Sequence, residues 1–389
     1  MYKYDNYCTM AYTTFQKVDE NDTLEMYHFK HDVDYPDANS KLKGIVVDKA
    51  SQEVVCSTSM HTVEYDVDQV DKIPGIENID WDATTIMVSE EGCFLRVYHH
   101  NDAWYISTHR KLDADESKWG SRYSFKTLFI HALVDAMYSD EKDDERVFDL
   151  ENDFLNKLDK NYIYTFLIRN NSSNRIVCQA PLRDEPKLYF SGVYPLGDEH
   201  DYIPKFTPPL SVQGVPTAQL LSCKKVDELK AAVHAMSNQR HQGVIVFSKV
   251  GGVTNVFKVM CRDYLALKDV RNNCSNLMFR YAQVRGDEQM RNKMIALFNQ
   301  FSYDFYNFEN TVYKIALHIC NQYVNRYVRK QYAAVTPLQY KVTKKVREWY
   351  LQNPNEHRVG VDTVLSFINA EPPIYIYKLV VEFDMAASQ

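Results

Sequence analysis

The sequence predicts an α+β protein with a strand-rich N-terminal part and a mainly helical C-terminal part. Short β-type runs separated by turns fill most of residues 1–270, and single helical segments interrupt them. From residue 271 onward, apolar residues recur instead at intervals of three and four. We therefore predict two domains, 1–270 and 271–389, with residues 1–70 as a strand-rich lead-in to the first.

The predicted strands of the first domain form antiparallel pairs. Two strands and a turn are expected within 44–59, and a three-stranded meander is expected over 84–88, 93–100 and 103–109. Strands are also expected at 162–169 and 175–180, on either side of a polar turn. A hairpin of 243–248 and 253–260 should turn at Gly251 and Gly252. Helices are expected at 124–136 and 226–238. Antiparallel sheets flanked by helices follow from this order.

In the second domain, residues 301–332 predict a long amphipathic helix. Thr336, Pro337 and Gln339 are typical of a helix start with a capping box, and that helix should end at Gln352. Asp362 is expected to cap one more short helix. Residues 374–383, IYIYKLVVEF, alternate in a way that predicts a terminal strand.

Bulk properties exclude several classes of protein. The net charge of −7 does not favour nucleic acid as a ligand, and the acidity is N-terminal: residues 1–270 carry 30 Lys and Arg against 42 Asp and Glu, whereas 271–389 carry 15 against 10. None of the eight cysteines forms a CxxC pair, so a zinc site is not expected. Without an apolar run of 18 residues or an N-terminal apolar segment, we expect no membrane span and no secretion.

Four segments carry a family resemblance by their order and spacing. They are a turn ending at Gly92 followed by LRVYHHNDAWYISTH, then LDADESKWGSRYSFKTLF at 112–129, YTFLIRNNSSNRIV at 164–177, and QGVIVF at 242–247 with FKVMCRDYLALKDVR at 257–271. Together they resemble the ATP-dependent RNA ligases of phages and large DNA viruses, within the covalent nucleotidyltransferase superfamily. The resemblance covers roughly residues 40–275 and implies a ligase-like nucleotidyltransferase domain.

The resemblance also implies a specific chemistry. In that family, a lysine in K-x-D-G attacks the α-phosphate of ATP and becomes a lysyl-AMP. A glutamate after the third strand motif holds the ribose, a glutamate in E-G-[VI]-V helps to hold Mg²⁺, and two lysines in K-x-K bind phosphates. The adenylate then passes to an RNA 5′-phosphate.

Most of these reactive side chains are missing at the matching positions. K-x-D-G falls on Ser89, Glu90, Glu91 and Gly92, so the nucleophile's position holds a serine. The ribose-binding glutamate falls on Ile168, within one residue, and Arg169 would suit the role no better. E-G-V-V becomes Gln242, Gly243, Val244 and Ile245, and K-x-K becomes Lys258, Val259 and Met260. The resemblance therefore implies a vestigial nucleotide pocket with no catalytic residue, no metal site and no cofactor.

A displaced lysine could still supply the nucleophile. Residues 73–110 contain no lysine, so a small shift of the alignment does not provide one. Lys41, in Lys41-Leu42-Lys43-Gly44, is the best remaining candidate, although Lys43-Gly44 better matches the basic residue and glycine that precede the nucleophile in the family. Lys111 and Lys157 lack the glycine that should follow. If Lys41 acts, the protein is an active RNA ligase that requires ATP and Mg²⁺.

Three functions remain open at this point. The first is an inactive ligase-like protein that binds other proteins as a structural component, as a minor capsid or virion protein of a large DNA virus would. The second is the active ligase with a displaced lysine. The third is a non-catalytic RNA or nucleotide binder using Lys258 or Lys344, which the N-terminal acidity disfavours. All three imply a location inside the host cell, and the first adds the virion.

Overall fold

The computed structural model describes most of the chain, and every structural statement below concerns these residues. They are 14–30, 42–119, 121–137, 147–170, 176–178, 186–196, 202–237, 240–331 and 334–387. The chain divides into two compact units, Met1–Lys268 and Asp269–Gln389. Each unit is considered separately below.

The first sheet of unit 1 is antiparallel and has the order β1-β2-β4-β5. Its strands are β1 (Phe15–Glu20), β2 (Leu24–Phe29), β4 (Ile45–Asp48) and β5 (Val54–Cys56). The β4–β5 pair confirms the two strands predicted within residues 44–59. A two-stranded sheet of β3 (Leu42–Lys43) and β6 (Ser59–Met60) accompanies it.

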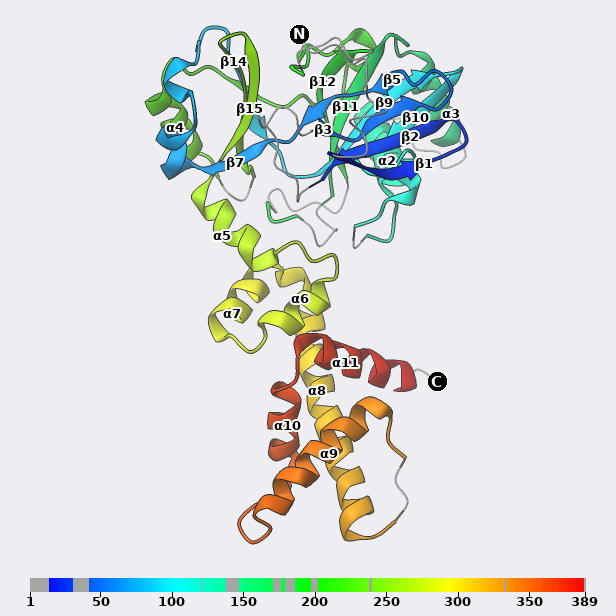
Figure 1. Ribbon diagram of the computed structural model, residues 1–389, viewed down its shortest axis with the longest axis vertical. Coiled ribbons are helices and arrows are strands. Elements are labelled where there is room, and N and C mark those ends of the chain that lie inside the picture. Colours follow the sequence, from blue (N-terminus) through cyan, green and yellow to red (C-terminus); the bar gives the residue numbers. More distant parts are fainter. Residues whose placement is uncertain are drawn as a thin grey trace. The chain divides into compact units, whose positions relative to one another are not determined.

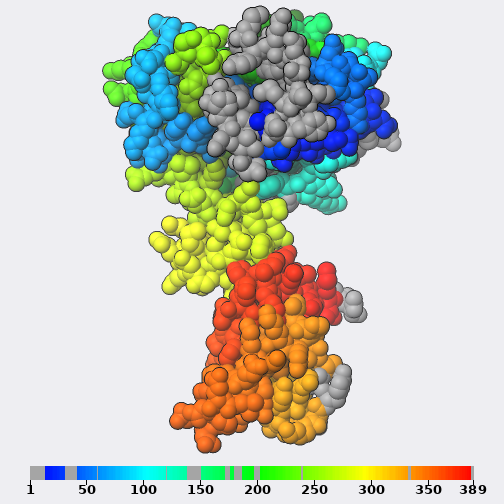
Figure 2. Space-filling model, viewed as in Figure 1, coloured from blue at the N-terminus to red at the C-terminus, as the bar shows by residue number. Residues whose placement is uncertain are grey.

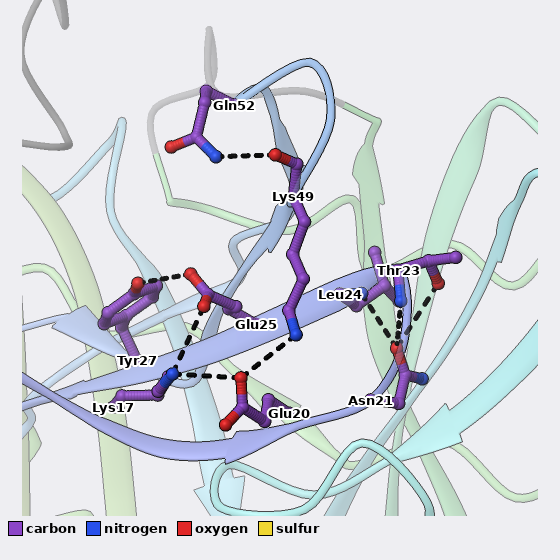
Figure 3. A network of polar contacts seen from close by, with 9 residues as sticks. All are labelled: Lys17, Glu20, Asn21, Thr23, Leu24, Glu25, Tyr27, Lys49 and Gln52. Carbon is purple, nitrogen blue, oxygen red and sulfur yellow. Dashed lines mark hydrogen bonds and ion pairs between the residues drawn. The ribbon is translucent and has the colours of Figure 1, made fainter.

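Polar contacts join the first three of these strands at the surface, as Figure 3 shows. Lys17 on β1 donates to Glu20 at 2.9 Å and to Glu25 on β2 at 3.3 Å. Lys49, just after β4, reaches the same Glu20 at 3.0 Å. Because most of these groups are exposed, the contacts contribute little to stability.

The second sheet of unit 1 has the order β10-β9-β11-β12 and carries two helices. Its strands are β9 (Cys93–His100), β10 (Ala103–Ser107), β11 (Tyr162–Arg169) and β12 (Lys187–Pro195), and the helices are α2 (Phe125–Met137) and α3 (Val147–Asn156). Phe129 and Phe154 of the helices meet Phe166 of β11 in edge-to-face contacts, with ring centres 5.3 and 6.2 Å apart. These residues belong to a buried hydrophobic core formed by the sheet and the two helices.

The third sheet has five strands, in the order β13-β8-β14-β15-β7. They are β7 (Val63–Asp66), β8 (Thr85–Ser89), β13 (Leu220–Leu221), β14 (Gly243–Val250) and β15 (Val253–Met260), and α4 (Val226–His234) lies beside them. In Figure 1 this sheet forms one side of unit 1 and the β9–β12 sheet the other. The predicted β14–β15 hairpin is confirmed, whereas β7 runs parallel to β15. Short 3₁₀ turns lie at Val67–Lys72, Ile76–Asn78, Ala114–Glu116 and Leu210–Val212.

The predicted meander over 84–109 is wrong in one connection. β9 and β10 form the expected hairpin, but β8 pairs with β13 and β14 in the other sheet. Residues 89–92 therefore cross between two sheets rather than closing a tight turn within one. Residues 176–178, the described part of the predicted strand 175–180, also form no strand. The backbone amides of Val177 and Cys178 instead donate to the side chain of Glu91.

Unit 2 is helical. After α5 (Arg262–Arg271), which contains the boundary between the units, the helices are α6 (Leu277–Val284), α7 (Glu288–Leu297), a 3₁₀ turn at Asn299–Phe301, α8 (Ser302–Tyr323), a π-helical turn η8 (Val324–Val328), α9 (Pro337–Gln352), α10 (Val361–Asn369) and α11 (Pro373–Ala387). α8 contacts α6, α9, α10 and α11. Its buried residues include Phe305, Phe308, Val312, Ile315 and Ile319, at the predicted spacing.

The predicted boundaries of α9 are confirmed. Thr336 Oγ1 accepts from the amide of Gln339 at 3.3 Å, and the Gln339 side chain accepts from the amide of Thr336 at 3.4 Å. The short helix near Asp362 is also confirmed, but its N-cap is Gly360 and Asp362 lies in the first turn. An acidic residue is favourable there because of the helix dipole.

The predicted terminal strand 374–383 is wrong, because Pro373–Ala387 is helix α11. The alternation of Ile and Tyr was misleading. The residues that α11 buries are Tyr375, Ile376, Leu379 and Val380, which recur at helical spacing and pack on the other helices of unit 2. Pro373 opens the helix at a position where a proline is tolerated.

Candidate functional site

Strand pairing in the third sheet brings three of the predicted site positions together. Gly243 at the start of β14 is paired with Ser89 at the end of β8 and with Met260 at the end of β15. The amide of Gln242 donates to the carbonyl of Ser89 at 2.9 Å, and Gln242 accepts from the amide of Cys261 at 2.9 Å. Three strand ends therefore lie level with one another around Gln242.

Gly243 makes this close pairing possible. Its φ is +142°, and a Cβ built on it would lie 2.0 Å from the carbonyl oxygen of Val259. Gly92, just before β9, has a similar role next to β11, since a Cβ there would lie 2.3 Å from the carbonyl oxygen of Ile168. Both glycines permit backbones to approach closer than any side chain would allow.

The side chain of Gln242 is the centre of a polar network. Its Oε1 accepts from Ser89 Oγ at 2.9 Å and from Lys258 Nζ at 3.4 Å. Its Nε2 donates to the hydroxyl of Tyr264 on α5 at 2.8 Å. Ser89 is only 2 % exposed, so its hydroxyl depends on this protein partner rather than on water.

Glu91 extends the network as a structural anion. Its Oε2 accepts from the backbone amides of Val177 and Cys178, both at 2.7 Å, and its Oε1 accepts from Tyr264 at 3.0 Å. The carboxylate is 7 % exposed. Burial, reinforced by the charge of Glu91, raises the pKa of both Cys178 and Tyr264. Glu91 therefore anchors the segment after β11 to the turn after β8.

Arg169, rather than Ile168, reaches this polar region. Ile168 pairs with Cys93 and is buried in the core between the second sheet and its helices. Arg169 Nη1 lies 3.4 Å from Glu90 Oε2 and donates to the carbonyl of Arg240 at 2.9 Å, while Nη2 donates to the carbonyl of Cys178. Glu90 also lies 3.0 Å from Nδ1 of His241. The buried Arg169 thus holds an acidic partner at the end of β11.

Lys43 is a further cation close to this network. Burial and the charge of Lys258 lower its pKa to about 8, against the opposing effect of Glu64. Glu64 pairs with Lys258 across β7 and β15 and forms an ion pair with Lys268 at 2.5 Å. Within the described residues, no carboxylate lies within ion-pair distance of Lys43. Lys41 lies outside the described residues.

The structure thus brings Ser89, Gln242 and Lys258 into direct contact and links Glu91 to them through Tyr264. Gly92, Gly243 and Met260 lie in the adjoining backbone, and Ile168 faces the core. Sequence reasoning missed Tyr264 and the Arg169–Glu90 pair. The sequence signal for Tyr264 was its place in DYLALK, directly after β15.

Two kinds of feature are absent from the described residues. No group of three or more His, Cys, Asp or Glu is placed to hold a metal ion there. No described helix combines the length and the apolar character that crossing a membrane requires.

Comparisons with known proteins identify relatives by sequence and, separately, similar structures. No family model matches the chain. Among solved structures, an archaeal ATP-dependent RNA ligase is 11 % identical with a TM-score of 0.41, covering 77 % of this chain and 70 % of its own. A putative ATP-dependent DNA ligase from Aquifex aeolicus is 13 % identical with a TM-score of 0.39, covering 76 % and 70 %.

Two curated viral proteins are similar in sequence, and both are called "Immediate-early protein ICP-46 homolog". The protein of Invertebrate iridescent virus 3 is 28 % identical over 297 residues, 73 % of this chain and 60 % of that protein. That of Invertebrate iridescent virus 6 is 28 % identical over 296 residues, 74 % and 62 %. The chain thus matches about three fifths of the length of these relatives. Over nearly three quarters of its own length, it is similar to immediate-early ICP-46 homologs of large DNA viruses.

Proposed function

We propose that this chain is a ligase-like protein of a large DNA virus that forms no covalent adenylate and acts by binding other proteins. The observation that carries the proposal is the hydrogen bond from Ser89 Oγ to Gln242 Oε1. A serine hydroxyl is a weak nucleophile unless a base takes its proton. The oxygen of a neutral amide is not such a base.

The absence of a lysine at position 89 should have a large effect on the rate of any adenylation. Removing a covalent nucleophile costs on the order of 10⁶ in turnover where this has been measured in another class of enzyme. Here the two hydroxyl groups that contact Gln242, those of Ser89 and Tyr264, are both buried and already hydrogen-bonded. Neither hydroxyl is therefore placed beside a base that could activate it for attack on a phosphate.

The residues around Gln242 also suit Mg²⁺ poorly. Mg²⁺ is held in such sites by carboxylates together with substrate phosphates. The position expected to carry the metal-binding carboxylate is Gln242, whose amide oxygen is taken by Ser89 and by the cation Lys258. Glu91, the carboxylate of the network, already accepts from two backbone amides and from Tyr264. We therefore assign no metal or nucleotide chemistry to this pocket.

The pairing of Arg169 with Glu90 supports the same conclusion. An acidic side chain is what the resemblance implies for ribose binding, and a buried arginine stands there instead. Its guanidinium already has three partners: Glu90 and two backbone carbonyls. This arrangement ties the end of β11 to Glu90, Cys178 and Arg240.

The relatives' name bears on where the protein acts. "Immediate-early" describes synthesis at the start of infection, which favours a role inside the infected cell over one in the particle. A minor capsid or virion component remains the alternative form of an interaction function. Immunoblots of an infection time course and of purified particles separate the two. We expect early synthesis and absence from particles; a fixed stoichiometry in purified particles would assign the protein to the virion.

Incubation of the full chain with α-labelled radioactive ATP and Mg²⁺ or Mn²⁺, followed by a denaturing gel, tests the loss of catalysis. We expect no labelled protein band. A ligase of known activity serves as the positive control. A band that survives denaturation and vanishes in a single-lysine variant would contradict the proposal.

A specific observation favours one active alternative, in which Lys43 is the displaced nucleophile. Lys43 is largely buried near Lys258, and a pKa of about 8 leaves a useful fraction of its amine neutral at physiological pH. In the labelling experiment, this alternative requires a band that Lys43→Ala abolishes. A band abolished by Lys41→Ala instead would identify the candidate that the sequence alone favours.

A further inference from the structure

A second cluster of charged and aromatic side chains lies in unit 2, far along the sequence from the pocket. It is formed by the π-helical turn η8 and helix α9. We define the arginine–tyrosine cluster as Arg326, Tyr327, Tyr340, Arg347 and Tyr350. Figure 2 shows the orange segment that contains α9 at the surface of its unit.

Each of the two arginines lies near two tyrosine rings. Arg326 Cζ lies 5.9 Å from the ring centre of Tyr327 and 5.2 Å from that of Tyr340. Arg347 Cζ lies 4.9 Å from the same Tyr327 ring and 5.4 Å from that of Tyr350. These four contacts all lie between Arg326 and Tyr350, so the two arginines and three tyrosines form one local cluster.

These guanidinium groups also lack the counter-charge that neighbouring cations have. On α9, Lys345 contacts Glu371, and Lys344 lies 3.8 Å from Glu348. Neither Arg326 nor Arg347 has an ion pair among the residues that the structure describes; the one side-chain hydrogen bond of Arg347 goes to the hydroxyl of Tyr323 at 3.4 Å. Two oriented, uncompensated guanidinium groups are suited to binding an anion.

The backbone at this point is itself uncommon. α8 ends at Tyr323 and continues as the π-helical turn Val324–Val328, which carries Arg326 and Tyr327. Such turns occur often at functional sites because they redirect side chains from the regular helical spacing. Arg329 and Lys330 follow immediately and are exposed, so the cationic surface continues beyond the cluster.

We propose that the arginine–tyrosine cluster is a binding surface for single-stranded nucleic acid. In this role the guanidinium groups contact phosphates, while the tyrosine rings, of which Tyr340 is 41 % exposed, stack on bases. An acidic protein segment would need the cations but not the interleaved rings. The excess of Lys and Arg in residues 271–389 agrees with an anionic ligand for this unit, in contrast to the acidic remainder of the chain.

The proposal is independent of the fate of the position-89 pocket. It concerns another unit and a non-covalent event, so a negative adenylation assay neither supports nor weakens it. Binding is measured by fluorescence polarisation of labelled oligo-U and oligo-dT with the full chain over a series of salt concentrations. Equal binding of both shows recognition of single strands in general, and preferential binding of oligo-U adds a contact to the 2′-hydroxyl.

The decisive variant is Arg326→Gln with Arg347→Gln. We expect its affinity to fall at least tenfold and its dependence on salt to weaken by about 1.4 in log–log slope, at about 0.7 per phosphate contact. The matched control is Lys293→Gln with Lys314→Gln, which removes two exposed charges from the same unit and should bind like the parent chain. Tyr340→Leu keeps every charge and should weaken binding about fivefold or more.

Thermal melting of each variant shows whether it folds, and Arg326→Lys, which keeps the charge but not the planar group, provides a milder change. Equal losses in the two double variants would show non-specific charge attraction and overturn the proposal. The proposal would also be overturned if Tyr340→Leu bound the oligonucleotide as well as the parent chain and polyglutamate competed as well as unlabelled oligonucleotide. That pattern would mean that any acidic polymer is a sufficient ligand. Absence of oligonucleotide binding at low salt would also overturn it.

Discussion

Ser89 and Lys258 donate to the same atom, Oε1 of Gln242, at 2.9 and 3.4 Å. Residues separated by more than 150 positions in the sequence thus meet at one amide. If this amide holds the strand ends together, its loss should be costly. This amide is therefore the point at which side chains from β8 and β15 are joined.

Replacing Gln242 by alanine should lower the free energy of unfolding by about 2–3 kcal/mol, because Ser89, Lys258 and Tyr264 all lose a partner in a poorly solvated place. Urea denaturation of the full chain measures this. Gln213→Ala, at an exposed glutamine, is the control and should change stability by less than about 0.5 kcal/mol. Similar effects of the two substitutions would mean that the network contributes little.

Gly243→Ala should be more damaging, by about 3 kcal/mol or more, because the new Cβ would lie 2.0 Å from the carbonyl oxygen of Val259 at a φ of +142°. Gly251→Ala in the turn of the same hairpin is the matched control. Its φ of +59° is unfavourable, but no atom lies within 4 Å, so a cost of about 1 kcal/mol is expected. Thermal melting should rank the two clearly. If they were equally tolerated, the tight pairing of Gly243 with Met260 would be wrong.

Lys43 provides a prediction that depends on pH. Its pKa is lowered to about 8 in the folded chain, from an ordinary value of 10.5. Between these values the unfolded chain binds more protons, so the contribution of Lys43 to stability rises with pH and is least favourable below pH 8. Lys43→Met should therefore stabilise the chain at pH 7, on the order of 1–3 kcal/mol given about 1.4 kcal/mol per pKa unit, and this advantage should shrink towards pH 10.

Denaturation of parent and variant at pH 7, 8, 9 and 10 tests this, with the exposed Lys293→Met as control. The control should show little change at any of these pH values. A stabilisation of Lys43→Met that stays constant over the range would show that Lys43 titrates normally.

Local signals in the sequence predict the elements whose turns, caps or periodicity are clear, and miss others such as β12 and α3. The helix from Pro337 to Gln352 was found because its cap depends on residues three positions apart. The β14–β15 hairpin was found because its turn is a Gly-Gly pair. In contrast, α11 was read as a strand, since what selects a helix there is the packing of Leu379 and Val380 against distant helices, which a local pattern does not contain.

The site was predictable in part. The family resemblance groups Ser89, Gln242 and Lys258. In the structure, Ser89 and Lys258 both donate to Gln242. That these residues derive from a nucleotide pocket stays a prediction. Two features could not be read from the sequence. The connection from β8 to β9 changes sheets, which only long-range pairing determines. Arg169 points towards Glu90 and Ile168 points into the core. A shift of the strand register by one residue would exchange these two orientations.

The central claim is that the chain forms no covalent adenylate. Intact-mass spectrometry of the full chain after incubation with ATP and Mg²⁺ or Mn²⁺ tests it most directly, beside parallel samples of Lys41→Ala and Lys43→Ala. The predicted result is one unmodified mass in all three samples. A species heavier by one AMP in the parent chain, absent from either lysine variant, would contradict the claim and show that a displaced lysine has taken over from position 89.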